Sequence, residues 1–308
     1  MQTTHGLPLR VSLDELRWFV AVAERGRVTQ AAEELHISQP ALSRALARLQ
    51  RELGVTLFDR RGRNLHLNRY GEVFLAHARR ALAEVESGRE AVEDLAGDEH
   101  GTVSLGFAPT LSTWLVPALV SAFRSEHPGP RFQLHQDSVG QLVNALHEGA
   151  ADLLLTPRPG DPRLSWRELG GERLQLVVPP AHRLAGRKRV RLAEAAGERF
   201  VMLKHAFDFR DLVEDLCRGA GFEPESGFEA EDVASARALV AAGLGVAVVP
   251  PLHGGGAGLG AAAPHVELSD STAVRSIGIV WDENRYRSPA TELFRKFALE
   301  RGRQLAQA

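Results

Sequence analysis

A short segment near the N-terminus carries side chains that can form hydrogen bonds with base-pair edges. Ser38 is a good N-cap, and Pro40 falls in the first turn of the helix that follows, where a missing N–H costs nothing. One face of this helix presents amide, hydroxyl and guanidinium groups, from Gln39, Ser43, Arg44 and Arg48. Glutamine can form a bidentate pair with adenine, and arginine can pair with guanine or hold a phosphate. The segment therefore predicts a surface that contacts a DNA duplex.

The elements around this helix complete a recognisable arrangement. Residues 12–15 form a capping box that starts a first helix, and Arg25-Gly26-Arg27 ends it. We expect Thr29 to cap a second, short helix over residues 30–35. The buried stripe of the third helix is predicted to be Leu42, Ala45, Leu46, Leu49 and Leu53. Two short helices joined by a tight turn, with a polar second helix, are typical of a helix-turn-helix.

A hairpin rich in arginine is predicted directly after the third helix. Residues 55–58 and 65–67 read as strands, and the turn between them carries Arg60, Arg61 and Arg63. Arginines in such a wing suit the negative potential of the backbone and the minor groove. For any single arginine, a solvated surface position is an equally simple explanation. The ordered combination of cap, turn, polar face and wing favours the DNA-binding reading.

Charge and composition support this division of the chain. The 308 residues carry a net charge of −2, but residues 1–70 contain eleven Arg, no Lys and seven acidic residues, which leaves +4. A basic head on an acidic body is expected of a nucleic-acid-binding head. The single cysteine, Cys217, rules out an internal disulfide and is expected to be a packed residue. No apolar stretch approaches the length of a membrane span and no signal peptide is seen, so we expect a cytoplasmic protein without membrane contact.

Motifs of other protein classes are not found. The twelve histidines show no spacing typical of metal ligands, so no metal or cofactor is expected. No nucleophile elbow positions a serine, which argues against an enzyme. The glycine-rich residues 254–260 lack the Lys-Ser/Thr of a phosphate-binding loop and read as a mobile loop.

A long helix is predicted to link the head to the rest of the chain. Asn68 can cap a helix that runs from about residue 69 to residue 95. Residues spaced alternately by four and three form a heptad seam, namely Phe74, Ala78, Ala81, Val85, Gly88, Val92 and Leu95. The small residues would permit close approach of a second helix. The alternative is a helix that packs on its own domain.

The body, from Thr102 onward, alternates strands with helices, which predicts parallel sheets covered by helices on both faces. Ligands of such sheets bind at the carboxyl ends of strands, where helix N-termini favour anions such as carboxylates. The candidate effector-binding residues in these turns are Thr110, Ser112, Ser138, Thr156, Lys204 and His205. Arg210, on the helix that follows, could pair with an anionic group together with Lys204 and His205. Three phenylalanines could wall an apolar part, namely Phe107, Phe207 and Phe209. Each candidate also has a structural explanation, as a helix cap, a surface residue or a core residue.

The head resembles the N-terminal domain of LysR-type transcriptional regulators. The match includes Phe19 and Val22, Thr29-Gln-Ala-Ala32, Leu35, Ser38-Gln-Pro-Ala41, Ser43, Leu49, Leu53-Gly54, Leu57-Phe58, Arg60, Leu67 and Gly71. The resemblance implies a winged helix-turn-helix in which Gln39, Pro40, Ser43 and Arg44 face the major groove. It also implies supporting roles for Thr29, Ser38 and the wing arginines. Asn68 stands where the family usually has Thr, and either residue caps a helix.

The body is similar to the effector domain of the same family, which has the two-lobed fold of type 2 periplasmic binding proteins. The anchors are Gly106, Leu115-Val-Pro117, Phe123, Pro128, Asp152-Leu153, the Val-Pro-Pro-x-His182 stretch and Gly243-Leu-Gly245 before Val-Val-Pro250. The resemblance implies a first lobe of residues 102–168 and 270–308 and a second lobe of residues 169–269. Ligand would lie between them. Val139-Gly140 stand where the family often has a second hydroxyl.

The sequence thus predicts an α/β protein with a winged helix-turn-helix over residues 1–67, a linker and dimerisation helix over 68–97, and an effector-binding domain over 102–308. It is expected to be a non-enzymatic transcriptional regulator whose partners are double-stranded DNA, a small effector such as a carboxylate, and itself. The resemblance implies a dimer through the linker helix, a tetramer with four heads, and RNA polymerase as a further partner. The alternative is a cytoplasmic solute-binding or enzymatic α/β protein whose head serves only for oligomerisation.

Overall fold

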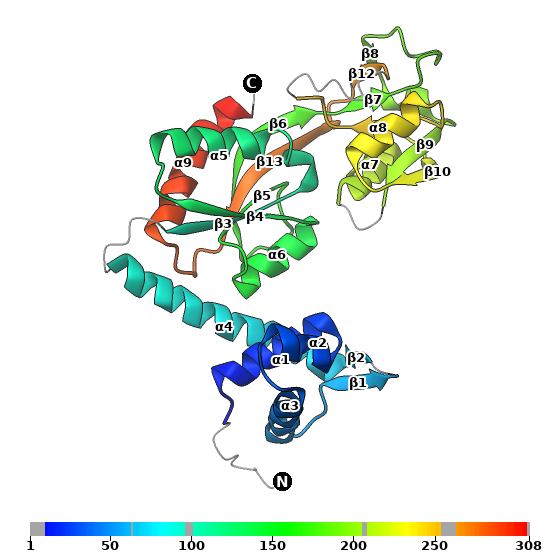
Figure 1. Ribbon diagram of the computed structural model, residues 1–308. Helices are drawn as coiled ribbons and strands as arrows, with labels where there is room; N and C mark the ends of the chain where they lie inside the picture. Colours follow the sequence, from blue (N-terminus) through cyan, green and yellow to red (C-terminus); the bar gives the residue numbers. More distant parts are fainter. Residues whose placement is uncertain (1–9, 63, 96–100, 205–207, 254–262, 307–308) are drawn as a thin grey trace, which may run out of the picture. The chain divides into compact units, whose positions relative to one another are not determined.

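The computed structural model describes residues 10–62, 64–95, 101–204, 208–253 and 263–306, which fall into two compact units (Figure 1). One unit, the head with its long helix, holds residues 1–96, and the other, the body, holds most of residues 97–308. Across the described part of the chain, none of the helices combines the length and the apolar character that crossing a membrane requires.

The three head helices begin and end largely where the sequence predicts. They are α1 (Leu13–Arg25), α2 (Val28–Glu34) and α3 (Gln39–Leu53). The capping box of α1 is present: the Glu15 N–H donates to Ser12 Oγ at 3.2 Å, and the Ser12 N–H donates to Glu15 Oε2 at 2.9 Å. The Ser38 hydroxyl accepts from the Ala41 N–H at 3.3 Å, which confirms Ser38 as the cap of α3.

The predicted cap of α2 is wrong. The helix begins at Val28, and its N-cap is Arg27, whose side chain makes no capping bond. Thr29 therefore lies inside the first turn, where it is exposed. The early start has a tertiary cause, because the wing fixes the chain just before the helix. The Leu65 N–H donates to the Gly26 carbonyl at 2.8 Å, and Arg27 Nε donates to Asn64 Oδ1 at 2.8 Å.

The wing consists of β1 (Phe58–Arg61) and β2 (Asn64–Leu67), paired antiparallel from Phe58↔Leu67 to Arg61↔Asn64. Its first strand starts three residues later than predicted. Leu57 is buried in the head core, and its N–H donates to the Gln50 side chain at 2.7 Å rather than to a partner strand. Arg60 and Arg61 are exposed, whereas Arg63 lies outside the described residues.

The linker helix α4 (Arg69–Leu95) has the predicted bounds, and the Asn68 carboxamide oxygen caps it by accepting from two backbone N–H groups at 3.0 Å. Its first turns belong to the head core, where Phe74 and Ala78 pack with Phe19. Gly71 lies against the wing, because an added Cβ would come within 2.1 Å of the Leu57 carbonyl oxygen. The later seam positions Ala81, Val85, Gly88 and Val92 are exposed, and nothing in the described chain covers them.

The first lobe of the body, lobe I, is a five-stranded sheet in the order β4-β3-β5-β13-β6. Its strands are β3 (Thr102–Phe107), β4 (Arg131–Gln136), β5 (Leu153–Thr156), β6 (Ser165–Arg173) and β13 (Val274–Trp281). Helices α5 (Leu115–Glu126) and α9 (Pro289–Leu305) cover one face, and α6 (Val139–Glu148) covers the other (Figure 1). The phenylalanines of α5 and α9 form the centre of the larger core, with Phe123 and Phe294 in edge contact at 5.1 Å.

The second lobe, lobe II, contains a four-stranded sheet in the order β11-β7-β12-β8 and the strand pair β10-β9. Its strands are β7 (Gln175–Val177), β8 (Arg189–Val190), β9 (Arg199–Leu203), β10 (Glu225–Ala230), β11 (Ala247–Val249) and β12 (His265–Leu268). A bridge between Phe200 and Val246 joins the two sets. Helices α7 (Asp208–Gly219) and α8 (Val233–Ala241) pack on them.

Two strands run between the lobes and pair along their whole length. The ladder of β6 and β13 extends from Ser165↔Trp281 to Arg173↔Val274. Both strands are antiparallel to their neighbours, because one leaves lobe I and the other returns to it. The prediction of parallel sheets holds in lobe I only for β3, β4 and β5, and in lobe II β7 is antiparallel to both β11 and β12. At the irregularity in this ladder, a Cβ on Gly278 would meet the Trp166 ring and the Arg167 carbonyl oxygen at 2.4 Å.

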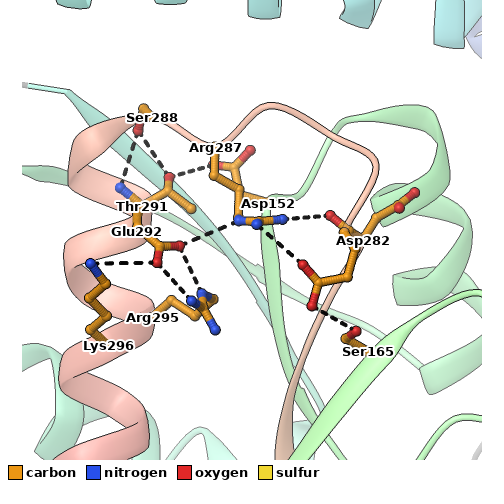
Figure 2. Close-up of polar contacts among 10 residues, drawn as sticks. Asp152, Ser165, Asp282, Arg287, Ser288, Thr291, Glu292, Arg295 and Lys296 are labelled. Carbon is orange, nitrogen blue, oxygen red and sulfur yellow. Dashed lines mark hydrogen bonds and ion pairs between the residues drawn. The ribbon is translucent and has the colours of Figure 1, made fainter.

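A polar network at one end of lobe I fixes the start of α9, after the chain has left β13 (Figure 2). The Asp152 carboxylate accepts from the Ser104 N–H at 2.9 Å and from the Thr291 hydroxyl at 3.3 Å. Ser288 caps α9 by accepting from the Thr291 N–H at 3.1 Å. Burial raises the pKa of Asp152, despite the hydrogen bond from Ser104 that acts in the opposite direction.

Charged side chains extend this network along the start of α9. Arg287 donates to the Asp282 carbonyl at 2.7 Å and lies 3.4 Å from a Glu292 oxygen. Arg295 pairs with the same carboxylate at 2.7 Å (Figure 2). The hydrogen bond from Arg295 lowers the pKa of Glu292, although burial opposes this shift.

We predict that Asp152 acts as a hydrogen-bond acceptor rather than as a charge. Asp152→Ala leaves the Ser104 N–H unpaired and should lower the free energy of unfolding by about 1–3 kcal/mol. Asp152→Asn keeps an acceptor and should stay within about 1 kcal/mol of the unaltered chain. Because the folded pKa is raised, the stabilisation by Asp152 is complete below its unfolded pKa and declines as pH rises through the folded pKa.

Urea denaturation of the three chains at a series of pH values checks this assignment. Asp152→Asn should lack the decline with pH that the unaltered chain shows. Equal destabilisation by Asn and Ala at neutral pH would show that the charge itself is required.

Candidate DNA-binding and effector sites

The exposed face of α3 brings the predicted base-reading residues together. Gln39 and Arg44 are exposed and Ser43 is half-buried, and the Gln39 amide donates to Ser43 Oγ at 3.0 Å. Within the described residues, Arg44 forms no hydrogen bond or ion pair. Its guanidinium, with five N–H donors, is free to bind an acceptor outside the chain.

Arg48 has a different environment on the same helix. Its Nε lies 2.6 Å from Oε1 of Glu15, whose side chain is only 3% exposed. Burial raises the pKa of Glu15, but the hydrogen bonds from Arg48 and Ser12 outweigh it, so that the pKa is lowered overall. Arg48 thus holds α3 against α1, and only its terminal nitrogens remain for a phosphate.

The remaining predicted DNA contacts lie around this face. Pro40 is exposed in the first turn of α3, and the Ser38 hydroxyl is engaged as the cap. Thr29 is exposed on α2, and Arg60 and Arg61 are exposed on the wing. Arg60 and Arg61 add positive charge beside that of Arg44 and Arg48, which is what phosphate binding requires.

The body contains a cavity of about 850 Å³ between the ends of lobes I and II. Three of the predicted effector-binding residues line it: Thr110, Ser112 and Ser138. Phe209 lines it as well, on the side of lobe II. Prolines and aromatic side chains form much of the remaining wall, from Pro109, Trp114, Pro157, Pro250 and Pro251. A largely apolar cavity with a few polar groups is typical of a small-molecule site.

Thr156 and Arg210 do not line this cavity. Thr156 is fully buried, and its hydroxyl donates to the Pro157 carbonyl at 2.8 Å. Arg210 is 6% exposed and is held by the carboxylates of Glu214 and Glu229, each at 2.7 Å. Both carboxylates neutralise the charge of Arg210, and its side chain lies outside the cavity lining.

The remaining candidates for effector binding are Lys204 and His205, and the remaining candidates for an apolar wall are Phe107 and Phe207. Lys204 is exposed and pairs with Glu231 rather than reaching into the cavity. His205 and Phe207 lie outside the described residues, as does the glycine-rich stretch from 254 to 260. Phe107 is buried in the core of lobe I and is no part of the cavity wall.

The sequence reasoning missed a charged cluster on the two strands that connect the lobes. Arg275 and Glu172 are register partners in β13 and β6, and their side chains are 4% and 2% exposed. Arg275 Nε and Nη2 contact the Glu172 carboxylate, and Nη1 donates to Thr110 Oγ1 at 2.7 Å. The sequence did contain a signal for this cluster, because Arg275 precedes the apolar run Ile277–Trp281. A charge in a buried strand requires a partner of opposite charge.

Residues of both lobes converge on this pair. His253, from lobe II, has its Nε2 2.6 Å from a Glu172 oxygen. Its ring stacks on Trp114 of lobe I, with centroids 3.8 Å apart and planes 13° from parallel. The Phe209 ring lies 5.5 Å from the Arg275 guanidinium. Burial lowers the pKa of Arg275, while Glu172 opposes the shift. An arginine stays protonated in such a site.

The described residues provide neither a metal site nor a reactive thiol. They contain no group of three or more His, Cys, Asp or Glu side chains that could hold a metal ion. Cys217 is buried in the core of lobe II, and burial raises the pKa of its thiol to about 12. Since the thiolate is the reactive form, this cysteine is inert at neutral pH.

Comparisons with known proteins agree with this architecture. Residues 13–72 match the model of the bacterial regulatory helix-turn-helix protein, lysR family, and residues 96–303 match the LysR substrate binding domain. The HTH-type transcriptional regulator YybE of Bacillus subtilis (strain 168) is 39% identical over 288 residues, which cover 93% of this chain and 97% of YybE. The transcriptional dual regulator GltC of the same organism is 34% identical, over 94% of this chain and 97% of GltC.

Solved structures show the same fold. A full-length OxyR from Pseudomonas aeruginosa gives a TM-score of 0.72 at 24% identity, over 97% of both chains. Full-length CbnR complexed with its target DNA gives a TM-score of 0.69 at 25% identity, over 95% of this chain and 100% of CbnR. With both domains matched over most of its length, the chain belongs to the LysR family of DNA-binding transcriptional regulators and carries the family's effector-binding domain, which excludes the solute-binding or enzymatic alternative.

Proposed function

We propose that the chain reads its operator with the exposed face of α3 and fixes its position on the duplex with the wing. The observation that supports this proposal most directly is the bare group of Gln39, Ser43 and Arg44 at the start of α3. Amide and guanidinium donors in that position match the edges of adenine and guanine. Six further residues are proposed to contact the sugar-phosphate backbone of the DNA. They are Thr29 and Ser38, near helix ends, and Arg48, Arg60, Arg61 and Arg63.

Arg44→Ala should weaken binding to an operator fragment by more than about tenfold, since a bidentate arginine contact is worth about 1–3 kcal/mol. Gel retardation against competitor DNA measures the change. Arg17→Ala is the matched control, because Arg17 is exposed on α1, away from the face of α3, and forms an ion pair with Asp14 of its own helix. The control should bind as the unaltered chain does. Unchanged specific binding by Arg44→Ala would show that α3 does not read the operator.

The protein is proposed to form a dimer through α4, and from two such dimers a tetramer. The second half of the seam supports this, because Val85 and Val92 are 46% and 66% exposed on a stretch of α4 that also carries many charged residues. A heptad seam of valine and small residues is buried when a second helix packs against it. Two linked heads would then read two half-sites on one face of the duplex.

Val85→Glu with Val92→Glu should dissociate the dimer, because four like charges would meet in one seam. Sedimentation velocity over a concentration series measures the change in mass. The control is Glu84→Gln with Arg89→Gln, which alters two exposed residues of α4 beside the seam. A dimer that survives the two glutamates would place the interface elsewhere.

We propose further that a small acidic effector, such as a carboxylate, binds in the cavity between the lobes and shifts the protein between two DNA-binding states. A ligand changes such an equilibrium only by binding the two states unequally, and a cavity walled by both lobes meets that condition. A bacterial regulator of this kind acts in the cytoplasm, where RNA polymerase is its further partner. A relative of the same fold, QuiR, was solved in complex with shikimate, which makes shikimate a useful first probe.

Filling the cavity should abolish the response to any effector. Ala234 lines the cavity near the start of α8, so Ala234→Trp reduces the space for a ligand. A thermal-shift screen of small acids, shikimate included, should stabilise the unaltered full-length chain, since a ligand of the native state raises Tm. The shift should be lost in Ala234→Trp and kept in Ala193→Trp, whose exposed site lies elsewhere on lobe II. Equal shifts in both variants would place the effector outside the cavity.

A further inference from the structure

Two arginines and a threonine line one part of the cavity, and a glutamate contacts one of the arginines. We call this set of Thr110, Glu172, Arg237 and Arg275 the acid corner. Thr110, Arg237 and Arg275 line the cavity, and Glu172 lies directly behind Arg275. They come from different parts of the body: Thr110 from the turn after β3, Glu172 and Arg275 from the connecting strands, and Arg237 from α8.

The hydrogen bonds within the acid corner leave donors unused. Arg275 Nη1 donates to Thr110 Oγ1, so the hydroxyl proton of Thr110 must point to another acceptor. Arg275 Nη2 is in ion-pair contact with Glu172, but it is buried without a hydrogen-bond acceptor among the described residues. A buried donor without an acceptor is unfavourable. Because this nitrogen is closed to water, a ligand oxygen reaches it only after the Arg275 side chain moves toward the cavity.

Arg237 lacks a carboxylate partner. Its Nη2 donates to the Pro250 carbonyl at 2.7 Å, and its buried Nε has no acceptor in the described part of the chain. Burial lowers the pKa of Arg237, and only the charge of Glu172 opposes the shift. The guanidinium nevertheless stays protonated, so it keeps a positive charge that no neighbouring carboxylate neutralises through contact.

The charges of the acid corner therefore do not balance. Two guanidiniums face one carboxylate, which leaves an excess of one positive charge in a poorly solvated wall. The other charged residues of the cavity lining are exposed and screened by solvent, namely Arg158, Asp208, Glu231 and Asp232. His253 uses one ring nitrogen to contact Glu172 and stacks on Trp114.

We propose that the acid corner binds the acidic group of a monoanionic effector, with a single carboxylate accepting from Thr110, Arg237 and Arg275. This assignment rests on the proposal that the cavity is the effector site. The ligand's one negative charge neutralises the excess, and its oxygens accept charge-assisted hydrogen bonds from the guanidiniums that line the cavity. Phe209 and Trp114 then lie against the apolar remainder of the molecule. A cationic ligand is disfavoured here, and a neutral ligand leaves the excess charge in place.

Pairs of probes that differ only in charge test the acid corner. Benzoate with benzamide, and cyclohexanecarboxylate with its amide, are titrated into the full-length chain by calorimetry at constant ionic strength. The acid should bind at least about tenfold more tightly than its amide, as expected for charge-assisted hydrogen bonds. Arg237→Gln and Thr110→Val should each reduce this ratio to about threefold or less. Arg158→Gln, which removes an exposed guanidinium of the same cavity, should leave the ratio unchanged.

Glu172→Gln should act in the opposite direction. It keeps a side chain able to contact His253 but raises the excess charge from one to two, so affinity for the acids should rise by about tenfold while affinity for the amides stays constant. The unliganded variant should be less stable, because Arg275 loses its counter-ion. A purely structural role for the cluster predicts the lower stability without the tighter acid binding.

The outcomes separate this inference from the proposal on which it rests. Equal binding of acids and amides by the unaltered chain, or an acid preference that survives Arg237→Gln and Thr110→Val, would overturn the acid corner and leave the cavity as the effector site. If no probe binds the unaltered chain, and Ala234→Trp also changes no thermal shift, both the acid corner and the cavity as effector site are overturned.

Discussion

The ladder between β6 and β13 is the constraint on which the body depends. These two strands are the chain's passages between the lobes, and they pair from Ser165↔Trp281 to Arg173↔Val274. One end of this ladder belongs to the sheet of lobe I, and the other end leads into lobe II. The pairing of the two strands therefore holds the lobes together. Glu172 and Arg275 belong to it, so the charged end of the cavity is built into the connection itself. A ligand at that end therefore touches the part of the fold through which the lobes are joined.

The buried ion pair on this ladder has a cost as well as a use. Taking a carboxylate and a guanidinium out of water is unfavourable, and a hydrophobic pair of similar size often stabilises a fold as well or better. The pair is therefore weak evidence for stability and stronger evidence for a function that needs charge. Here Glu172 holds Arg275 in place while Thr110 and Phe209 fix its orientation. This restraint keeps the positive charge of Arg275 at the wall of the cavity.

Sequence reasoning was most accurate where local chemistry decides the structure. Ser38 and Asn68 cap their helices because the capping bond depends on one side chain and the next few backbone groups. Thr29 failed as a cap because a contact from the distant wing, between Leu65 and Gly26, starts α2 earlier. The turn residues Thr110 and Ser138 line the cavity. They were chosen from the rule that ligands of α/β sheets bind at the carboxyl ends of strands. Arg275, Glu172 and His253 were missed because only tertiary pairing brings residues so far apart into contact.

The contact between Gly71 and Leu57 has a mechanical consequence. With no side chain on Gly71, the first turn of α4 lies against the backbone that leads into the wing, and Phe74 interlocks with Phe19 beneath it. The long helix cannot turn about its own axis there without dragging the hairpin and the neighbouring helices along. Torsion applied far down the linker would thus rotate α4, the wing and α3, which share one core, as a single rigid unit.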